Sequence, residues 1–140
     1  MPKLKTYDLF LSHVWRYSHH YDRLCDMLES AKNFYFRDYS VPISNPVVDP
    51  NKKISKTKLL ALLDPQVKPV NCVLIMGGMY SHYSEWVEDE IKLAQKYNKP
   101  IIGIYPRGQE KMPRIIQQAA DELVKWNTIS IVTAIRKHSI

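Results

Sequence analysis

One carboxylate, Glu90, stands out because its position conflicts with the helical pattern around it. Residues 84–97 have the periodicity of a helix at about 100° per residue, with Asp89 on the polar arc. Glu90 falls in the apolar arc, one turn after Trp86 and one turn before Ala94. Burying a bare carboxylate costs several kcal/mol, so this side chain must reach a partner or a cleft. Glu90 is therefore a candidate for chemistry, and a paired structural carboxylate is the alternative.

The elements that must position Glu90 alternate between strands and helices. The expected strands cover residues 7–11, a segment beginning at 34–36, 70–76, 101–105 and about 124–126, and the expected helices cover 17–31, 55–63, 84–97, 113–123 and 130–137. Such alternation predicts an α/β three-layer sandwich with a five-stranded parallel sheet, and the flavodoxin-like strand order 2-1-3-4-5 is favoured.

Sheets of this kind bind ligands at the carboxyl ends of their strands, near the point where the strand order reverses. Here the segments concerned are 12–16, 38–45 and 77–84, where Gly77-Gly78 is expected to stop the third strand. Ser84 is the expected N-cap of the following helix. Glu90 would then enter the same region from the first turns of that helix and face a cleft.

Composition narrows the class of protein. The chain has 140 residues, 45% apolar and 24% charged, which predicts one soluble globular domain spanning residues 1–140. It has no apolar run of about 18 residues and no signal-peptide core, so we expect no membrane span and a cytoplasmic location. Cys25 and Cys72 are interpreted as small buried hydrophobic residues.

The charge bears on the kind of ligand. A formal charge of +6 favours anionic ligands. The sequence has no Lys/Arg block with interleaved aromatic residues, so a nucleic acid is not expected, whereas a nucleotide fits the same charge. His19 and His20 are adjacent and do not share a helical face. His82 and His138 have no companions at ligand spacing, and no metal site is expected.

Three short motifs occur in a suggestive order: YDLFLSH at 7–13, DYSVP at 38–42, and Trp86-x-x-x-Glu90. With this placement the chain resembles the TIR-like domains of the prokaryotic branch that includes the TIR protein of the Thoeris anti-phage system (ThsB-like). The resemblance runs over nearly the whole chain, through Trp126-Asn127-Thr128. It departs from the family at 14–17, where Val-Trp-Arg-Tyr replaces the acidic pair of many bacterial TIR sequences.

The resemblance implies an activity. In that family the glutamate of the Trp-x-x-x-Glu motif is the catalytic residue of NAD⁺ cleavage, and this role passes to Glu90. The nicotinamide–ribose bond would be broken to give an ADP-ribose-derived signal, cyclic or conjugated, that a separate effector protein reads. NAD⁺ is then the substrate, with no further cofactor, and the chain is expected to form a homo-oligomer on activation.

The chemistry suits a single carboxylate. Cleavage passes through an oxocarbenium-like state, whose positive charge a nearby carboxylate stabilises. Nicotinamide is already a cationic leaving group, so no general acid is required.

Other polar and aromatic side chains near the strand ends are candidates for holding the substrate. Ser12 and His13 suit a phosphate or ribose, while Trp15, Tyr39 and Tyr80 suit stacking on a ring. For each of these a plain loop or packing role is the alternative, and Trp86 is interpreted mainly as a packing residue. The expected substrate-binding set is Ser12, His13, Trp15, Tyr39, Asn45, Tyr80, Ser84 and Trp86.

Two other functions stay open on the sequence. A non-catalytic TIR-like module would act by self-association or by recruiting a partner, with Glu90 as a structural acid. A nucleoside deoxyribosyltransferase-like enzyme also uses a glutamate on an α/β sheet, and the products formed from deoxynucleosides would distinguish it.

Overall fold

The computed structural model describes residues 5–11, 19–39, 63–77, 80–105 and 112–140, with side chains for all of these except 19–21 and 80–86. Five strands form one sheet of order β2-β1-β3-β4-β5, and every neighbouring pair runs parallel. The strands are β1 (Thr6–Leu11), β2 (Tyr35–Asp38), β3 (Cys72–Met76), β4 (Ile101–Ile104) and β5 (Glu122–Val124). The predicted parallel sheet and its order are confirmed.

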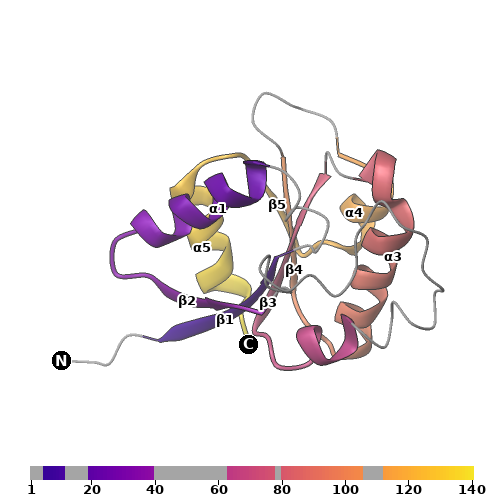
Figure 1. Cartoon of the computed structure of the whole chain (residues 1–140), viewed down its shortest axis with the longest axis horizontal. Helices are drawn as coiled ribbons and strands as arrows, with labels where there is room; N and C mark the ends of the chain where they lie inside the picture. Colours follow the sequence, from indigo (N-terminus) through magenta and orange to yellow (C-terminus); the bar gives the residue numbers. More distant parts are fainter. Residues whose placement is uncertain (1–4, 12–18, 40–62, 78–79, 106–111) are drawn as a thin grey trace.

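The helices lie on both faces of this sheet. They are α1 (His19–Ser30), α3 (Tyr80–Lys96), α4 (Arg114–Ala119) and α5 (Thr128–His138), and residues 63–67 are also helical. Figure 1 shows α1 and α5 on one face and α3 and α4 on the other. The predicted three-layer arrangement is therefore confirmed.

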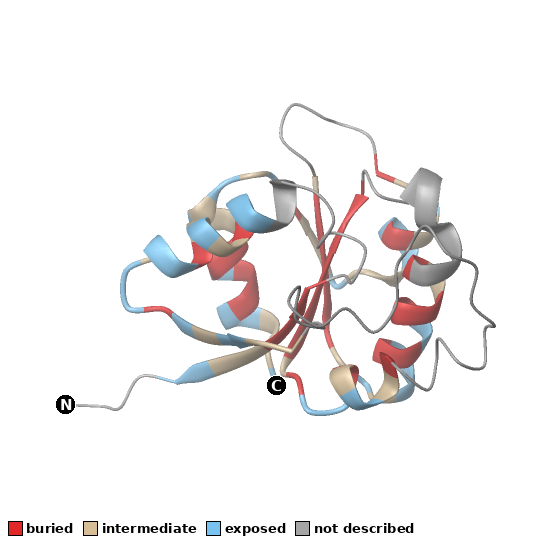
Figure 2. Ribbon diagram, viewed as in Figure 1, coloured by how far each residue is buried: buried red, intermediate tan, exposed pale blue. Residues whose placement is uncertain are grey.

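The core is centred on β3. All five of its residues are buried (Figure 2), and so are Leu9, Phe10 and Leu11 of β1 and every residue of β4. A strand covered on both faces has no polar side to show, which explains its continuous apolar run. Each fully buried side chain of this size contributes roughly 1.5–3 kcal/mol, so β3 anchors the sheet.

Asn71 joins the start of β3 to the middle of β1. Its N–H donates to Asp8 O at 2.6 Å, and its Oδ1 accepts from Asp8 N–H at 2.8 Å. Its Nδ2 donates to Ile140 O at 2.8 Å. One side chain thus ties β1, the start of β3 and the residue at position 140 together.

Two predicted helix boundaries, one end and one start, differ from the structure. The helix expected over about 55–63 lies almost wholly outside the described residues, but residues 63–67 are helical, so Asp64-Pro65 does not end a helix. Lys68 N–H donates to Asp64 O at 3.1 Å, because a proline removes its own backbone donor and not those of later residues. The helix of Glu90 begins at Tyr80, four residues before the expected N-cap Ser84.

The helix that follows Pro113 is shorter than expected. It ends at Ala119, and Leu123 lies in β5 instead. Asp121 N–H donates to Ile101 O at 2.7 Å, and Asp121 Oδ2 accepts from Ile101 N–H at 2.8 Å. These two bonds begin the pairing of β5 with β4, so the chain turns into a strand before another helical turn is made.

Candidate functional site

The sheet order fixes where a ligand site is expected. β1 and β3 are neighbours, but the chain leaves β1 for β2 on one side and leaves β3 for β4 on the other. This is the point of reversal at which such sheets bind ligands. The carboxyl edge of the sheet, next to Leu11 and Met76, is therefore the candidate position.

Most of the expected substrate-binding residues cannot be placed there by side chain. Ser12, His13, Trp15 and Asn45 lie outside the described residues. The backbones of Tyr80, Ser84 and Trp86 lie in α3, but their side chains are outside the described part. Their contribution to a site stays a prediction.

Tyr39 is the member of the set whose surroundings are described. It follows β2 directly, and its N–H donates to Leu9 O at 2.9 Å, which adds one residue to the pairing of β2 with β1. Its half-buried side chain packs against the hydrophobic core. This position at the carboxyl edge agrees with a packing role at the rim of the candidate site.

Glu90 is placed differently from the expectation. It lies ten residues after the start of α3, about 15 Å along the axis at 1.5 Å per residue, and not in the first turns. Its side chain is 0% exposed, and it interacts with other groups of the protein. The expectation of a cleft open to solvent at Glu90 is wrong for this structure, because the residue is fully buried.

Asp89 is a second buried carboxylate that the sequence analysis missed. It is 2% exposed, although the helical pattern assigned it to the polar arc. Lys96 lies two turns later on the same side of α3, and its Nζ lies 3.4 Å from Asp64 Oδ2. Asp64 therefore meets the end of α3 through Lys96 and Tyr97. The available sequence signal was Leu93, an apolar residue one turn after Asp89 that is also buried.

Two adjacent buried carboxylates give α3 an unusual electrostatic character. The effective penalty for burying one ion is several kcal/mol even after partners are found. In a low-dielectric setting, a negative charge stabilises a nearby positive charge more strongly than it does in water. Adjacent residues of a helix do not face each other, so each carboxylate must be considered separately as a stabiliser of positive charge.

Other reactive groups of the described residues suit structural roles. Burial raises the pKa of the Cys72 thiol to about 12, so it stays protonated and is a poor nucleophile. His138 Nε2 lies 2.8 Å from Glu122 Oε1, a pair that joins α5 to β5. The described residues contain no group of three or more His, Cys, Asp or Glu side chains that could hold a metal ion.

Gly77 does more than stop β3. It is buried, and a Cβ atom added to it would lie 2.5 Å from Met112 Sδ. Real Cβ atoms essentially never approach another heavy atom so closely. The backbone at the carboxyl end of β3 is thus in close contact with the segment that precedes α4.

With this geometry in place, comparison with known proteins identifies the family. Residues 10–111 match the family described as the TIR-like domain of Thoeris protein ThsB, a match that covers well over half of the 140-residue chain. The chain belongs to this family. The ThsB-like domain therefore points to a role in Thoeris anti-phage defence. The matched residues include the whole of α3.

One solved structure shares the fold at low sequence identity. A conserved protein from Enterococcus faecalis V583 has a TM-score of 0.55 at 12% identity, over 95% of the ThsB-like chain and 99% of its own. A 3-dehydroquinate dehydratase-like protein from Bifidobacterium longum has a TM-score of 0.45 at 8% identity, over 96% and 94% of the two chains, and supports no conclusion. Comparison with curated proteins finds no match.

One further property concerns membranes. Among the helices of the described residues, none has the length and apolar character needed to cross a lipid bilayer.

Proposed function

We propose that this ThsB-like domain cleaves NAD⁺ at the nicotinamide–ribose bond, with Glu90 as the catalytic carboxylate. One observation carries the proposal: in a chain of this family, the glutamate of Trp86-x-x-x-Glu90 is a fully buried acid on α3. Burial of a carboxylate is costly, so an acid kept in the core of this chain is a candidate for function.

The proposed chemistry needs one negative charge at the right place. As the glycosidic bond breaks, positive charge develops on the ribose, and the Glu90 carboxylate stabilises it. Nicotinamide leaves as a neutral molecule, and water or another nucleophile completes the ADP-ribose-derived product. Because Glu90 is buried in the described conformation, the proposal requires a rearrangement that brings the substrate to it, such as one coupled to activation of the domain.

The proposal extends to partners. Self-assembly of the domain would accompany activation, and the ADP-ribose-derived product would be read by a separate effector protein. Both follow from the suggested role in Thoeris defence.

A second candidate function is a non-catalytic TIR-like interaction module. The observation that favours it is the same burial: Glu90 is 0% exposed and already interacts within the protein. In that case the acid supports the fold, and removing one member of a buried charge pair would cost about 3–5 kcal/mol of stability.

The test compares Glu90→Gln with the matched control Glu88→Gln, which makes the same change at a half-buried position of the same helix. NAD⁺ consumption and nicotinamide release are measured with purified protein and in cells challenged with phage, and the products are identified by mass spectrometry. Losing an electrostatic stabiliser of this kind typically lowers the rate by about 10²–10³. We expect this loss in Glu90→Gln and an unchanged rate in Glu88→Gln.

Chemical denaturation of the same variants separates the two candidates. If Glu90 is catalytic, the free energy of unfolding of Glu90→Gln should stay within about 1 kcal/mol of the parent, well below the structural cost of a broken buried pair. Equal NAD⁺ cleavage by the parent and Glu90→Gln would remove the catalytic assignment. No cleavage by the parent in challenged cells, together with a large loss of stability in Glu90→Gln, would favour the interaction module.

A further inference from the structure

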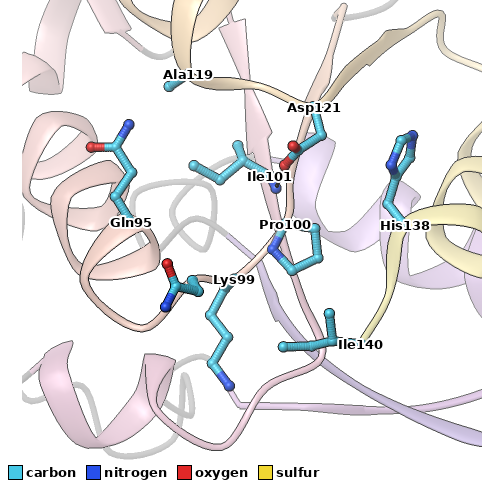
Figure 3. Close-up of a pocket in the computed structure, with 9 residues that line it drawn as sticks. Gln95, Lys99, Pro100, Ile101, Ala119, Asp121, His138 and Ile140 are labelled. Carbon is cyan, nitrogen blue, oxygen red and sulfur yellow. Dashed lines mark hydrogen bonds between the residues drawn. The ribbon is translucent and has the colours of Figure 1, made fainter.

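The two edge strands of the sheet, β2 and β5, differ in how they are protected from pairing with another chain. β5 has only three residues, which include Glu122, and the charged residues Asp121 and Lys125 flank it. Figure 3 shows Asp121 beside Ile101, whose N–H it accepts at 2.8 Å. Short strands and charged side chains are the usual protection of a sheet edge. The edge at β5 is therefore poorly suited to pairing.

The segment around β2 has the composition of a strand that pairs readily. Residues 34–39 have the sequence Phe-Tyr-Phe-Arg-Asp-Tyr, with four aromatic residues, no proline or glycine, and one positive charge balanced by one negative charge. Exposed segments of six or seven residues with these properties tend to pair with other strands. Within the described part of the chain no strand pairs with the outer side of β2. Tyr35 of this strand is 55% exposed.

The charge of Arg37 is already balanced by the neighbouring strand. Arg37 Nε donates to Asp8 Oδ1 of β1 at 2.7 Å, and the arginine side chain is still 64% exposed. A planar guanidinium that keeps its ion pair can also stack on an aromatic ring. Arg37 is therefore a possible contact for a second strand and not a barrier to it.

The backbone of β2 has hydrogen-bonding groups that face outward. Tyr39 N–H donates to Leu9 O at 2.9 Å, so the backbone groups of Tyr39 face β1. In a parallel pair, residues whose backbone groups face the neighbouring strand alternate with residues whose groups face away. Phe36, three positions before Tyr39, therefore directs its N–H and C=O to the outer side of the sheet.

We propose that two copies of the chain associate by antiparallel pairing of β2 with β2, about a two-fold axis that passes between the two Phe36 residues. The two Phe36 residues exchange backbone hydrogen bonds, and Tyr35 of each copy lies opposite Arg37 of the other. Phe36 also lines a hollow of about 370 Å³ between α1 and β2, which leaves room for the second phenyl ring. The pairing gives a surface to the proposed self-assembly and does not depend on NAD⁺ cleavage.

Other antiparallel registers of β2 on β2 are less favourable. An axis at Arg37 brings the two arginines directly opposite each other, and like charges in this position are destabilising. An axis at Tyr35 pairs only residues 34–36, because Asn33 has a left-handed backbone (φ 56°) and cannot continue an extended strand. The axis at Phe36 pairs residues 34–38, which include the whole of β2.

Sedimentation equilibrium of the full chain tests the association. A strand pair of this length buries less than the roughly 800 Å² per partner of a stable complex, so we expect a weak dimer that forms at high protein concentration. Tyr35→Lys removes two symmetric contacts with Arg37 and should raise the dissociation constant about tenfold. Ile129→Lys is the matched control: it adds the same charge at an 80% exposed apolar residue of α5, and the dissociation constant should be unchanged.

Cysteine cross-linking tests the register. In this register positions 35 and 37 of the two copies are directly opposite, with Cα atoms about 4.5 Å apart, within the range that a disulfide spans. A mixture of Tyr35→Cys and Arg37→Cys should therefore form a disulfide-linked dimer under mild oxidation. Either variant alone should not, because its two cysteines would be diagonal, about 7–8 Å apart. The parent chain controls for Cys25 and Cys72.

Three outcomes would overturn the proposal. They are a parent chain that stays monomeric at millimolar concentration, an equal dissociation constant for the parent and Tyr35→Lys, or cross-linking of either cysteine variant alone as efficient as that of the mixture. Glu90→Gln should dimerise like the parent. Failure here is therefore distinguishable from failure of the proposed NAD⁺ cleavage, which is tested at Glu90.

Discussion

Helices α5 and α3 cover opposite faces of the same sheet with different kinds of buried side chain. The buried residues of α5 are all apolar: Ile131, Val132, Ala134 and Ile135. On α3 the buried residues include two carboxylates beside the apolar ones: Val87, Asp89, Glu90, Ile91, Leu93 and Ala94. Packing alone accounts for α5, whereas it predicts no acid on the buried side of α3.

The ends of α5 also follow general rules. Asn127 caps its first turn, with Oδ1 accepting from Ser130 N–H at 2.7 Å. Its last turn carries Arg136, Lys137 and His138, where positive charge is favoured by the helix dipole. The comparison shows that α5 covers its face of the sheet without a buried acid. The energetic cost of burying Asp89 and Glu90 is therefore not explained by helix packing, which makes these acids candidates for function.

The largest effect on stability is expected for a cavity under α5. Ile135→Ala removes a fully buried side chain and should lower the free energy of unfolding by about 2–5 kcal/mol, measured by urea denaturation. Thr133→Ala, at an exposed position of the same helix, should change it by less than about 0.5 kcal/mol. Similar values for the two variants would contradict the assignment of α5 as a packing helix.

A smaller effect is expected at the start of α5. Asn127→Ala removes the side-chain acceptor of Ser130 N–H and should cost about 1 kcal/mol. Asn127→Asp retains an acceptor and should restore most of the stability. If the aspartate variant is as unstable as the alanine variant, the capping bond is not the cause.

The smallest effect is expected where α3 meets residues 63–67, and it depends on pH. Tyr97 Oη donates to Asp64 Oδ1 at 2.6 Å, and this bond, followed by Lys96, lowers the pKa of Asp64. A lowered folded-state pKa gives stability that is present above the unfolded value of about 4 and lost as the pH falls through the folded value. The Tm difference between the parent and Tyr97→Phe should therefore be largest near neutral pH and shrink in acid.

The stability that this hydrogen bond contributes is also lost at alkaline pH. Asp64 also raises the pKa of Tyr97, so the contribution of the tyrosine is lost as the pH rises through that raised value. Tyr35→Phe is the control, since Tyr35 is 55% exposed on the edge strand. A Tm difference for Tyr97→Phe that is constant from acid to neutral pH would show that the bond to Asp64 does not contribute.

Much of the fold was predictable because it depends on patterns that are local in sequence. The unbroken apolar run of β3 indicated a strand buried on both faces, and the right-handed crossover rule reduced the strand orders to few. The ends of helices were less predictable. The end of α4 depends on Asp121 meeting Ile101, residues 20 positions apart, and no local pattern contains that contact.

The candidate site was predictable in part. The helical wheel placed Glu90 on the buried side, and the structure confirms its burial. The wheel failed for Asp89, because the pattern of one helix does not show which other segments of the chain cover its polar side.

The contact between Gly77 and Met112 has a consequence for evolution within the family. Position 77 accepts a side chain only if position 112 becomes smaller or its flexible thioether moves aside. A shorter residue at position 112 should therefore make alanine or serine at position 77 easier to accommodate.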